Sequence, residues 1–247
     1  MLKSKKKIVI ITGASRGLGL SLARKFLQEG DLVFGVSRTK RYWASARKTV
    51  SHPENFHLSC FDLTREARVK KFIQEIRRRQ GRIDLVINNA GYGGGLCRIE
   101  DLSLKEWNRY FEGNLVSAFL VSKHVLPVLK KQKKGLLINI SSMAGQRAVP
   151  RLSAYSASKF GLLALSQCIA KENSEFGVRA VTVCPGGMNT KMRADLFGKK
   201  DSEKQQTTDF VAEIILNVIA GKLKVESGGD IVIRHGKIAA IHPCPAA

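Results

Sequence analysis

Short, continuous apolar segments alternate with amphipathic segments along most of the chain. The apolar segments span 7–13, 32–38, 55–64, 83–91, 135–142, 178–187 and 229–236. The segments with helical spacing of apolar residues span 17–30, 65–81, 103–133, 155–173 and 210–221. Apolar runs without alternating polar residues are typical of parallel strands buried on both faces. The pattern therefore predicts an α/β fold, a Rossmann-type doubly wound parallel sheet with helices on both faces.

The same pattern sets expectations for how the chain is organised. No linker rich in proline, serine or glycine divides the 247 residues, so residues 1–247 are expected to form a single dinucleotide-binding and catalytic domain. The helical segment 103–133 is expected to break before Asn114. The segment 229–236 is expected to be the last strand.

The chain is strongly basic, with 42 lysines and arginines against 20 aspartates and glutamates and a formal net charge of +22. Such a charge favours anionic partners, which include nucleotides, phosphorylated carriers, membrane surfaces and nucleic acids. Aromatic residues make up 7% of the chain and do not interleave with the basic runs, so no specific nucleic acid partner is expected. A basic, solvated surface explains the charge equally well.

Neither a membrane span nor a metal site is expected. The first apolar run, 8–11, is too short for a signal peptide and no longer run follows, which predicts a soluble, cytoplasmic protein. The five cysteines lack metal-finger or redox-motif spacing and are interpreted as reduced structural thiols. Cys60 and Cys184 lie in strand-like runs and are expected in the core.

A glycine-rich turn links the first predicted strand to the first predicted helix. In the stretch TGASRGLG, residues 12–19, Gly13, Gly17 and Gly19 follow the spacing G-x-x-x-G-x-G. A pyrophosphate bound at a helix N-terminus needs backbone that turns tightly and approaches it closely. This position between strand and helix therefore predicts a dinucleotide site.

The end of the second predicted strand indicates which dinucleotide is bound. A carboxylate there would accept a hydrogen bond from a ribose 2′-hydroxyl, but this chain has Arg38 and a second arginine, Arg16, in the glycine turn. Guanidinium groups suit a 2′-phosphate, which favours NADP(H); alternatively, Arg38 is a solvated loop residue. Asp62 either accepts from the adenine amino group or caps the following helix.

Tyr155 and Lys159 occupy positions i and i+4 of a predicted helix, and so share one helical face. A nearby ammonium group favours a phenolate, so the pKa of Tyr155 is expected to fall toward neutral pH. A tyrosine with such a pKa is a general acid or base for proton transfer.

Taken together, the motifs resemble the short-chain dehydrogenases/reductases, over nearly the whole chain and in the classical, NADP-preferring form. The resemblance rests on the glycine turn, Asn88-Asn89-Ala90-Gly91, Asn114, Ser142, Tyr155 with Lys159, and Pro185-Gly186 with Thr190, all in family order. It implies that NADP(H) is bound by Gly13, Ser15, Arg16, Gly17, Leu18, Gly19, Arg38, Asp62, Leu63, Asn89, Ala90, Gly91, Tyr155, Lys159, Pro185, Gly186 and Thr190.

The resemblance also implies a role for each catalytic residue. Tyr155 would transfer the proton, Ser142 would hold the substrate carbonyl, and Ser141 would point away. Lys159 would bind the nicotinamide ribose, and Asn114 would hold a water that relays the proton. Thr190 would contact the nicotinamide carboxamide.

Three segments are expected to wall the substrate pocket: 91–96, 143–154 and 186–203. The last of these is a candidate mobile lid, at about 188–206. Its apolar residues Met188, Met192, Leu196 and Phe197 indicate a largely apolar pocket. Arg147, Arg151 and Arg193 either anchor an anionic group or face solvent.

The leading functional hypothesis is an NADPH-dependent carbonyl reductase, or the reverse alcohol dehydrogenase, with a small-molecule substrate. An alternative is reduction of a 3-oxoacyl thioester on an acidic acyl carrier protein, docked by the basic stretch 130–134. The C-terminal sequence KLKVESGGDIVIRHGK departs from that branch of the family. A remote alternative is a nucleotide-sensing or nucleic-acid-binding protein without catalysis.

The resemblance further implies a homotetramer, with a homodimer as second choice. The helices near 114–130 and from Tyr155 onward are expected to pair across a two-fold axis. The strand DIVIR, 230–234, is expected at a second contact.

Overall fold

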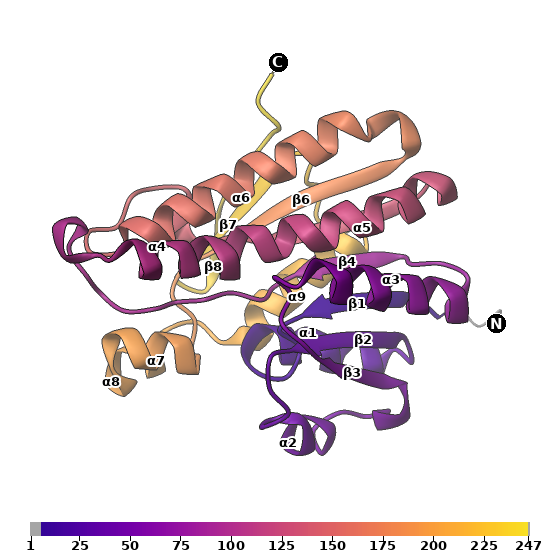
Figure 1. Cartoon of the computed structure of the whole chain (residues 1–247), viewed down its shortest axis with the longest axis horizontal. Coiled ribbons are helices and arrows are strands. Elements are labelled where there is room, and N and C mark those ends of the chain that lie inside the picture. Colours follow the sequence, from indigo (N-terminus) through magenta and orange to yellow (C-terminus); the bar gives the residue numbers. More distant parts are fainter. Residues whose placement is uncertain (1–5, 247) are drawn as a thin grey trace.

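One mixed sheet forms the centre of the protein, seen in a computed structural model that describes residues 6–246. Residues 1–5 and 247 of the expected domain lie outside the described residues. The eight strands are ordered β3-β2-β1-β4-β5-β6-β7-β8 (Figure 1). They are β1 (Ile8–Thr12), β2 (Leu32–Ser37), β3 (Phe56–Cys60), β4 (Leu85–Asn88), β5 (Gly135–Ile140), β6 (Val178–Pro185), β7 (Asp230–Arg234) and β8 (Lys237–His242).

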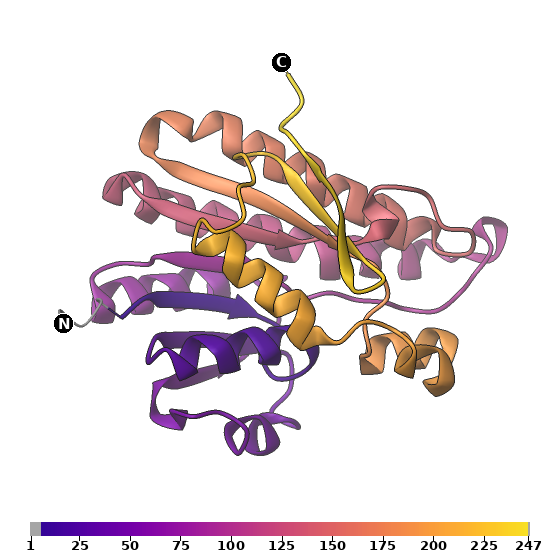
Figure 2. The ribbon, with the colours of Figure 1, turned by 180° about the vertical axis from the view of Figure 1, so that it is seen from behind.

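Helices cover both faces of this sheet, which confirms the predicted doubly wound architecture. The helices α3 (Glu66–Gln80), α5 (Ser117–Gln132) and α6 (Ser153–Glu172) lie on the face toward the viewer in Figure 1. The opposite face carries α1 (Gly17–Gln28) and α9 (Thr208–Ile219) (Figure 2). Four shorter helices are α2 (Trp43–Arg47), α4 (Leu104–Phe111), α7 (Lys191–Phe197) and α8 (Lys199–Glu203).

The two-sided cover explains why the strands read as continuous apolar runs. In β1, Val9 and Ile11 belong to the core under α1 and α9. Ile8 and Ile10 belong to the core under α3 and α5. Both faces of the strand are therefore buried, and period-two alternation disappears.

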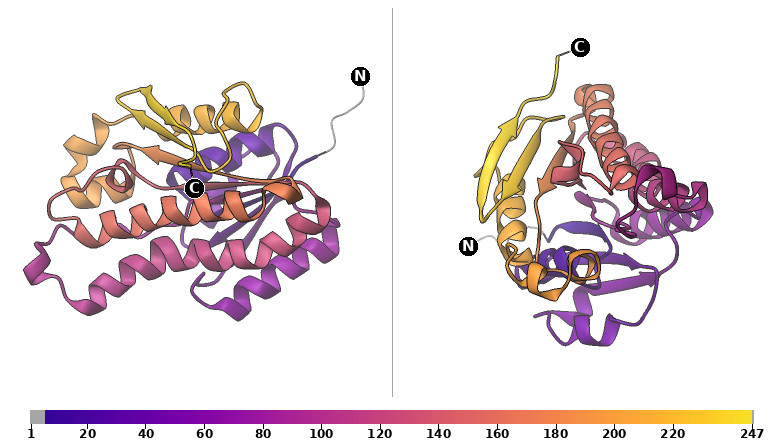
Figure 3. Two further views of the ribbon diagram at one scale, coloured as in Figure 1. Left: turned by 90° about the horizontal axis from the view of Figure 1, so that it is seen from above. Right: turned by 90° about the vertical axis from the view of Figure 1, so that its left-hand side faces the viewer.

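The C-terminal end differs from the prediction. The strand DIVIR is β7, which lies between β6 and an additional strand, β8. The β8 strand pairs antiparallel with β7 and is mostly exposed; the exposed fractions of Ile238 and Ile241 are 39% and 41%. β8 covers the edge of β7, so a contact between copies at this end could not use that edge of β7 (Figure 3).

The expected break in the segment 103–133 is a change of helical winding. The helix α4 passes into a π-helical turn, Glu112–Val116, and continues as α5 without a cap. A π turn inserts an extra residue per hydrogen-bonded ring and is frequent at functional sites. Asn114 lies in the middle of this turn and is 1% exposed.

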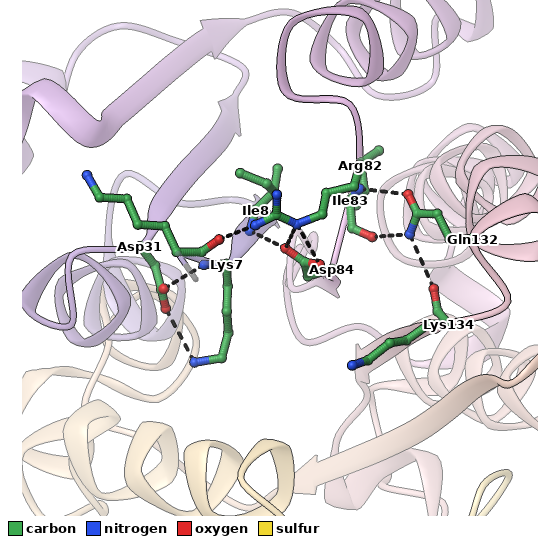
Figure 4. A network of polar contacts seen from close by, with 9 residues as sticks. Lys7, Ile8, Asp31, Arg82, Ile83, Asp84, Gln132 and Lys134 are labelled. Atoms are coloured by element: carbon green, nitrogen blue, oxygen red, sulfur yellow. Dashed lines mark hydrogen bonds and ion pairs between the residues drawn. The ribbon is translucent and has the colours of Figure 1, made fainter. Parts of the chain in front are cut away.

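A polar network ties the elements together at the amino edge of the sheet (Figure 4). The Asp31 carboxylate accepts from the Lys7 backbone N–H at 2.8 Å, and Asp84 accepts from the Ile8 N–H at 2.7 Å. The Gln132 amide exchanges hydrogen bonds with the Ile83 N–H and C=O at 2.9 and 2.7 Å. The two carboxylates are thus engaged by backbone groups that would otherwise lack partners.

Within residues 6–246, no helix is both long enough and apolar enough to cross a membrane. The same range contains no group of three or more potential metal ligands. All five cysteines are free thiols. Cys184 is buried as predicted, whereas Cys60 is only half-buried because its strand lies at the sheet edge.

Candidate active site

The glycine turn after β1 is held against the end of β4. Gly13 has φ +70°, and a Cβ there would lie 3.0 Å from the Asn89 side chain and 3.1 Å from the Ala90 Cα. The Thr12 hydroxyl accepts from the backbone N–H groups of Asn89 and Ala90, both at 2.9 Å. The Asn89 side-chain amide donates back to the Thr12 carbonyl at 2.9 Å. The turn is therefore fixed beside the N-terminus of α1.

A cavity of about 460 Å³ runs from this turn to the start of α6. Most of the expected cofactor residues line it, namely Gly13, Ser15, Arg16, Gly17, Leu18, Arg38, Asp62, Leu63, Asn89, Ala90, Gly91, Tyr155, Lys159 and Thr190. Gly19 does not, because its Cα faces the backbone of Gly13, where a Cβ would lie 2.2 Å from the carbonyl oxygen. Pro185 and Gly186 line a neighbouring cavity instead.

The end of this cavity near β2 is positively charged, as the sequence predicted, because two arginines line it. Arg16 and Arg38 are exposed, and within residues 6–246 neither forms an ion pair with a carboxylate. The Arg16 guanidinium lies 5.3 Å from the centre of the Tyr42 ring. Asp62 accepts from the N–H and the hydroxyl of Thr64, both at 2.9 Å. The cap residue of α3 is Arg65, so the alternative in which Asp62 caps that helix is wrong.

The opposite end of the cavity contains Tyr155 and Lys159 in the first turns of α6. The Lys159 side chain is 4% exposed, and its ammonium donates to the Ile140 carbonyl at 2.9 Å. The ammonium lies 5.8 Å from the centre of the Tyr155 ring. The α6 helix therefore brings both groups to the end of β5, as their spacing predicted.

Burial acts on these two groups in opposite senses. Burial lowers the pKa of Lys159 to about 8, because the charged ammonium loses its hydration. Burial raises the pKa of Tyr155 above its ordinary value, and the hydrogen bond with Ser142 opposes this rise. The expected fall in the pKa of Tyr155 is wrong for this structure, because desolvation outweighs the hydrogen bond with Ser142.

The two serines after β5 separate as predicted. The Ser141 hydroxyl is buried and donates to the backbone carbonyl of Lys159 at 2.9 Å. Ser142 remains half-buried beside Tyr155, and its hydroxyl accepts from the Ala144 N–H at 3.1 Å. Ser142 is therefore the serine that can reach a molecule next to Tyr155.

The side chain of Asn114 links the π turn to the loop that follows β4 and to α6. Its carbonyl oxygen accepts from the Tyr92 N–H at 2.8 Å. Its amide donates to the Tyr92 carbonyl at 3.1 Å and to the Ser158 hydroxyl at 3.0 Å. Because these bonds occupy the side chain, a water relay at this position would need the backbone of the π turn.

A second cavity of about 810 Å³ meets the first at Tyr155. The two share Ser141, Met188, Thr190 and Met192 as further lining residues. Of the three candidate anion-binding arginines, Arg147 and Arg193 line this second cavity, whereas Arg151 does not. Met188, Met192, Leu196 and Phe197 line it as predicted.

The sequence did not predict the wall formed by the turn between β7 and β8. Arg234, His235 and Gly236 line the second cavity, although they lie some 80 residues after Tyr155. The unusual C-terminal sequence was the available signal. It could not be placed without knowing that β7 follows β6 in the sheet and ends beside Gly186.

The basic stretch 130–134 lies far from both cavities. It ends α5 and precedes β5, at the amino edge, whereas Ser142 follows the carboxyl end of β5. Figure 4 shows Lys134 in the network of that amino edge. Docking of a carrier protein at these lysines, on the edge opposite Tyr155, is therefore not supported.

Comparisons with known proteins agree with this geometry. The short chain dehydrogenase family profile matches residues 7–201. Oxidoreductase BOA17 of Botryotinia fuckeliana is 31% identical, with 95% of this chain and 93% of that protein aligned. The NADPH-dependent pterin aldehyde reductase of Arabidopsis thaliana is 29% identical, over 92% of this chain and 93% of that protein. The structure of an alcohol dehydrogenase from Thermococcus sibiricus, complexed with 5-hydroxy-NADP, is 27% identical with a TM-score of 0.81, covering 93% of this chain and 97% of that one. The chain thus belongs to the short-chain dehydrogenase family, whose members are oxidoreductases of alcohol and carbonyl groups.

Proposed function

We propose that this protein reduces a small-molecule carbonyl compound to an alcohol with NADPH, or catalyses the reverse reaction. The observation that carries the proposal is the meeting of two cavities at Tyr155. One cavity has the glycine turn and two arginines, and the other is largely apolar and holds Ser142. A relative named NADPH-dependent pterin aldehyde reductase supports both the reaction and the cofactor.

The residues of the first cavity fit a dinucleotide. Gly13 and Gly17, with φ of +70° and +53°, allow a tight turn beside the N-terminus of α1 and add no side chain at either position. Arg16 and Arg38 supply guanidinium donors for a 2′-phosphate. The bound nicotinamide would supply the hydride. The chain itself has to orient the carbonyl compound and provide the proton.

Tyr155 provides that proton from its hydroxyl to the carbonyl oxygen. Its raised pKa keeps it protonated at neutral pH, which suits a general acid in reduction. The Ser142 hydroxyl donates a second hydrogen bond to the same oxygen. Lys159, held by the Ile140 carbonyl, keeps a positive charge near the developing phenolate. Asn114 fixes α6 to the π turn through Ser158 and lies beside the route that resupplies the proton.

The segment 188–206 acts as a lid in this proposal, within a single domain 1–247. Met192 packs against Gly93, where a Cβ would lie 2.7 Å from its Cγ. Arg193 and Asp201 form an ion pair across the segment, with Nη2 to Oδ2 at 3.0 Å. The segment thereby contacts the β4 loop above the junction of the two cavities.

The two alternative functions have less support. A carrier-bound thioester is the second candidate substrate class. The position of the stretch 130–134 gives no argument that its carrier protein docks there. A nucleotide sensor or nucleic-acid-binding protein has no need for the buried Lys159 and the Tyr155 beside it, and the family relationship favours an enzyme.

Replacing Tyr155 with phenylalanine tests the chemistry. The Tyr155→Phe variant keeps the ring and loses the proton donor, so kcat should fall by about 10²–10⁴-fold or more. The affinity of this variant for NADPH, measured from the fluorescence of the cofactor, should stay within a few-fold of that of the unchanged protein. A variant that keeps most of its activity would show that the proton comes from another group.

The pH dependence of stability tests the buried ammonium. The pKa of Lys159 is about 8 in the folded chain against 10.5 ordinarily, so the unfolded chain binds more protons between these values. The free energy of unfolding should therefore rise with pH from about 8 to 10.5 by about 3 kcal/mol relative to the Lys159→Met variant. Urea unfolding at pH 7 to 10.5 measures this difference.

The exposed Lys131 provides the matched control for that experiment. A Lys131→Met variant should show the same pH dependence as the unchanged chain. If the curves of the Lys159→Met variant and the unchanged chain run parallel, the lysine is not held in a desolvated state.

Cofactor preference is tested at Arg38. The Arg38→Asp variant should lose the attraction to a 2′-phosphate and gain repulsion, so the ratio of kcat/KM for NADPH over NADH should fall by about 100-fold. The control Lys40→Asp makes the same charge change outside the cavity and should keep the ratio near that of the unchanged chain. A preference of the unchanged chain for NADH would contradict the assignment.

The proposed assembly is a homotetramer, with a homodimer as second choice, and it uses the outer face of α5 and α6. These helices lie side by side in Figures 1 and 3, and expose Phe119 and Phe160 at 45% and 44%. Light scattering should show an oligomer at micromolar concentration, and the double variant Phe119→Glu, Phe160→Glu should lower its mass at least twofold. Ile99 is 69% exposed and lies outside α5 and α6, so the control variant Ile99→Ser should leave the measured mass unchanged. A monomeric unchanged chain would refute the assembly.

A further inference from the structure

The second cavity has an unbalanced charge. Its lining includes the basic residues Arg147, Arg193, Lys204, Arg234 and His235 but no aspartate or glutamate. Arg193 is neutralised by a two-point ion pair with Asp201. For the other arginines and Lys204, no ion pair with a carboxylate occurs within residues 6–246. The cavity beside Tyr155 is therefore positively charged.

Within the described part of the chain, Arg234 is less exposed than the other three basic lining residues without an ion pair, Arg147, Lys204 and His235. It is half-buried at the end of β7, and its side chain crosses Gly186. A Cβ on Gly186 would lie 3.3 Å from the Arg234 Cγ, so the arginine stem fills the space that the glycine leaves. Gly186 directly follows β6 and lines the same cavity as Ser142 and Tyr155.

The turn that carries Arg234 is fixed to the end of the segment 188–206. The Gln206 side-chain amide donates to the Ile233 carbonyl at 3.1 Å. Its carbonyl oxygen accepts from the Gly236 N–H at 3.3 Å. Met188 and Gln206 form an isolated parallel β-bridge beside it. Arg234 is thus presented by a held turn, which limits the entropy lost when it binds a ligand.

Much of the remaining lining of this cavity is apolar. Met143, Val149, Leu152, Met188 and Leu196 all contribute to it. An uncompensated guanidinium next to apolar groups is costly to hide from water, but it binds a carboxylate or phosphate strongly through paired hydrogen bonds. A planar guanidinium also suits these groups better than an ammonium does.

We infer that the substrate is a carbonyl compound with an apolar body and an anionic group, carboxylate or phosphate, and that Arg234 binds this group. The inference rests on the proposed reduction at Tyr155. Arg147 and Lys204 add positive potential at the more exposed part of the cavity. Arg234 is then the residue that selects an acid over its neutral ester.

The test compares acids with their methyl esters as substrates of the NADPH-dependent reaction. Benzoylformate, 3-benzoylpropionate and 4-benzoylbutyrate place the carboxylate at increasing distance from the ketone. For at least one spacing, the unchanged protein should prefer the acid by about tenfold or more in kcat/KM, chiefly through KM. A phosphonate of the preferred spacing, compared with its dimethyl ester, shows which anion is favoured.

Arg234→Met keeps the stem that packs on Gly186 and removes the charge. The ratio of kcat/KM for acid over ester should fall by about 10–100-fold, which corresponds to a charge-assisted hydrogen bond. Arg234→Lys should restore part of the ratio. The control Lys237→Met removes a charge from the same hairpin outside the cavity and should leave the ratio unchanged. Equal ratios in the Arg234→Met variant and the unchanged protein, or a preference of the unchanged protein for esters, would overturn the inference.

A binding measurement separates this inference from the proposed function. Calorimetry with NADP⁺ present should show that 3-phenylpropionate binds more tightly than 3-phenylpropionamide, and that Arg234→Met abolishes the difference. If the unchanged protein reduces none of the ketones, the proposed function is refuted. A difference in binding between acid and amide would still uphold an anion site at Arg234. Equal binding of acid and amide would refute that site even if ketones are reduced.

Discussion

A charged ammonium group held almost out of water is the constraint on which the active site depends. Lys159 is 4% exposed, and its charge is stabilised by the Ile140 carbonyl at the end of β5. This contact requires α6 to lie close to the strand end. The Ser141 hydroxyl binds the Lys159 carbonyl, and Gly145 lies where a Cβ would be 2.8 Å from the same carbonyl oxygen. The approach of α6 thus fixes Lys159 and, one turn earlier, Tyr155.

The two edges of the parallel sheet use polar groups in different ways. At the amino edge, Asp31, Asp84 and Gln132 satisfy backbone groups of the strands and hold the elements in register. At the carboxyl edge, Thr12 and Asn89 hold a loop conformation whose glycines leave a cavity open. At the carboxyl edge, charged side chains such as Arg234 also line a space that a ligand can enter.

Features encoded by local sequence were predictable. The parallel sheet followed from continuous apolar runs, and the proximity of Tyr155 and Lys159 followed from helical spacing. The choice of Ser142 rather than Ser141 came from the resemblance to the short-chain dehydrogenases. Features that depend on tertiary packing were not predictable. The pKa of Tyr155 depends on how many protein atoms surround its hydroxyl, and the location of Arg234 depends on strand order. The exposed strand β8, KIAAIH, has neither the alternation nor the continuous apolar character that marks a strand in a sequence.

The hairpin of β7 and β8 also bears on how such a protein can diverge. The groups proposed to bind the cofactor and move the proton all lie before residue 191, whereas the hairpin that walls the substrate cavity is built from the last 20 residues or so. Insertions or exchanges near the C-terminus can therefore alter which molecule is admitted while the reacting groups stay in place. In this chain, the part of the cavity wall that carries Arg234 is separate in sequence from the reacting groups, so changes in the hairpin can alter the substrate range without touching them.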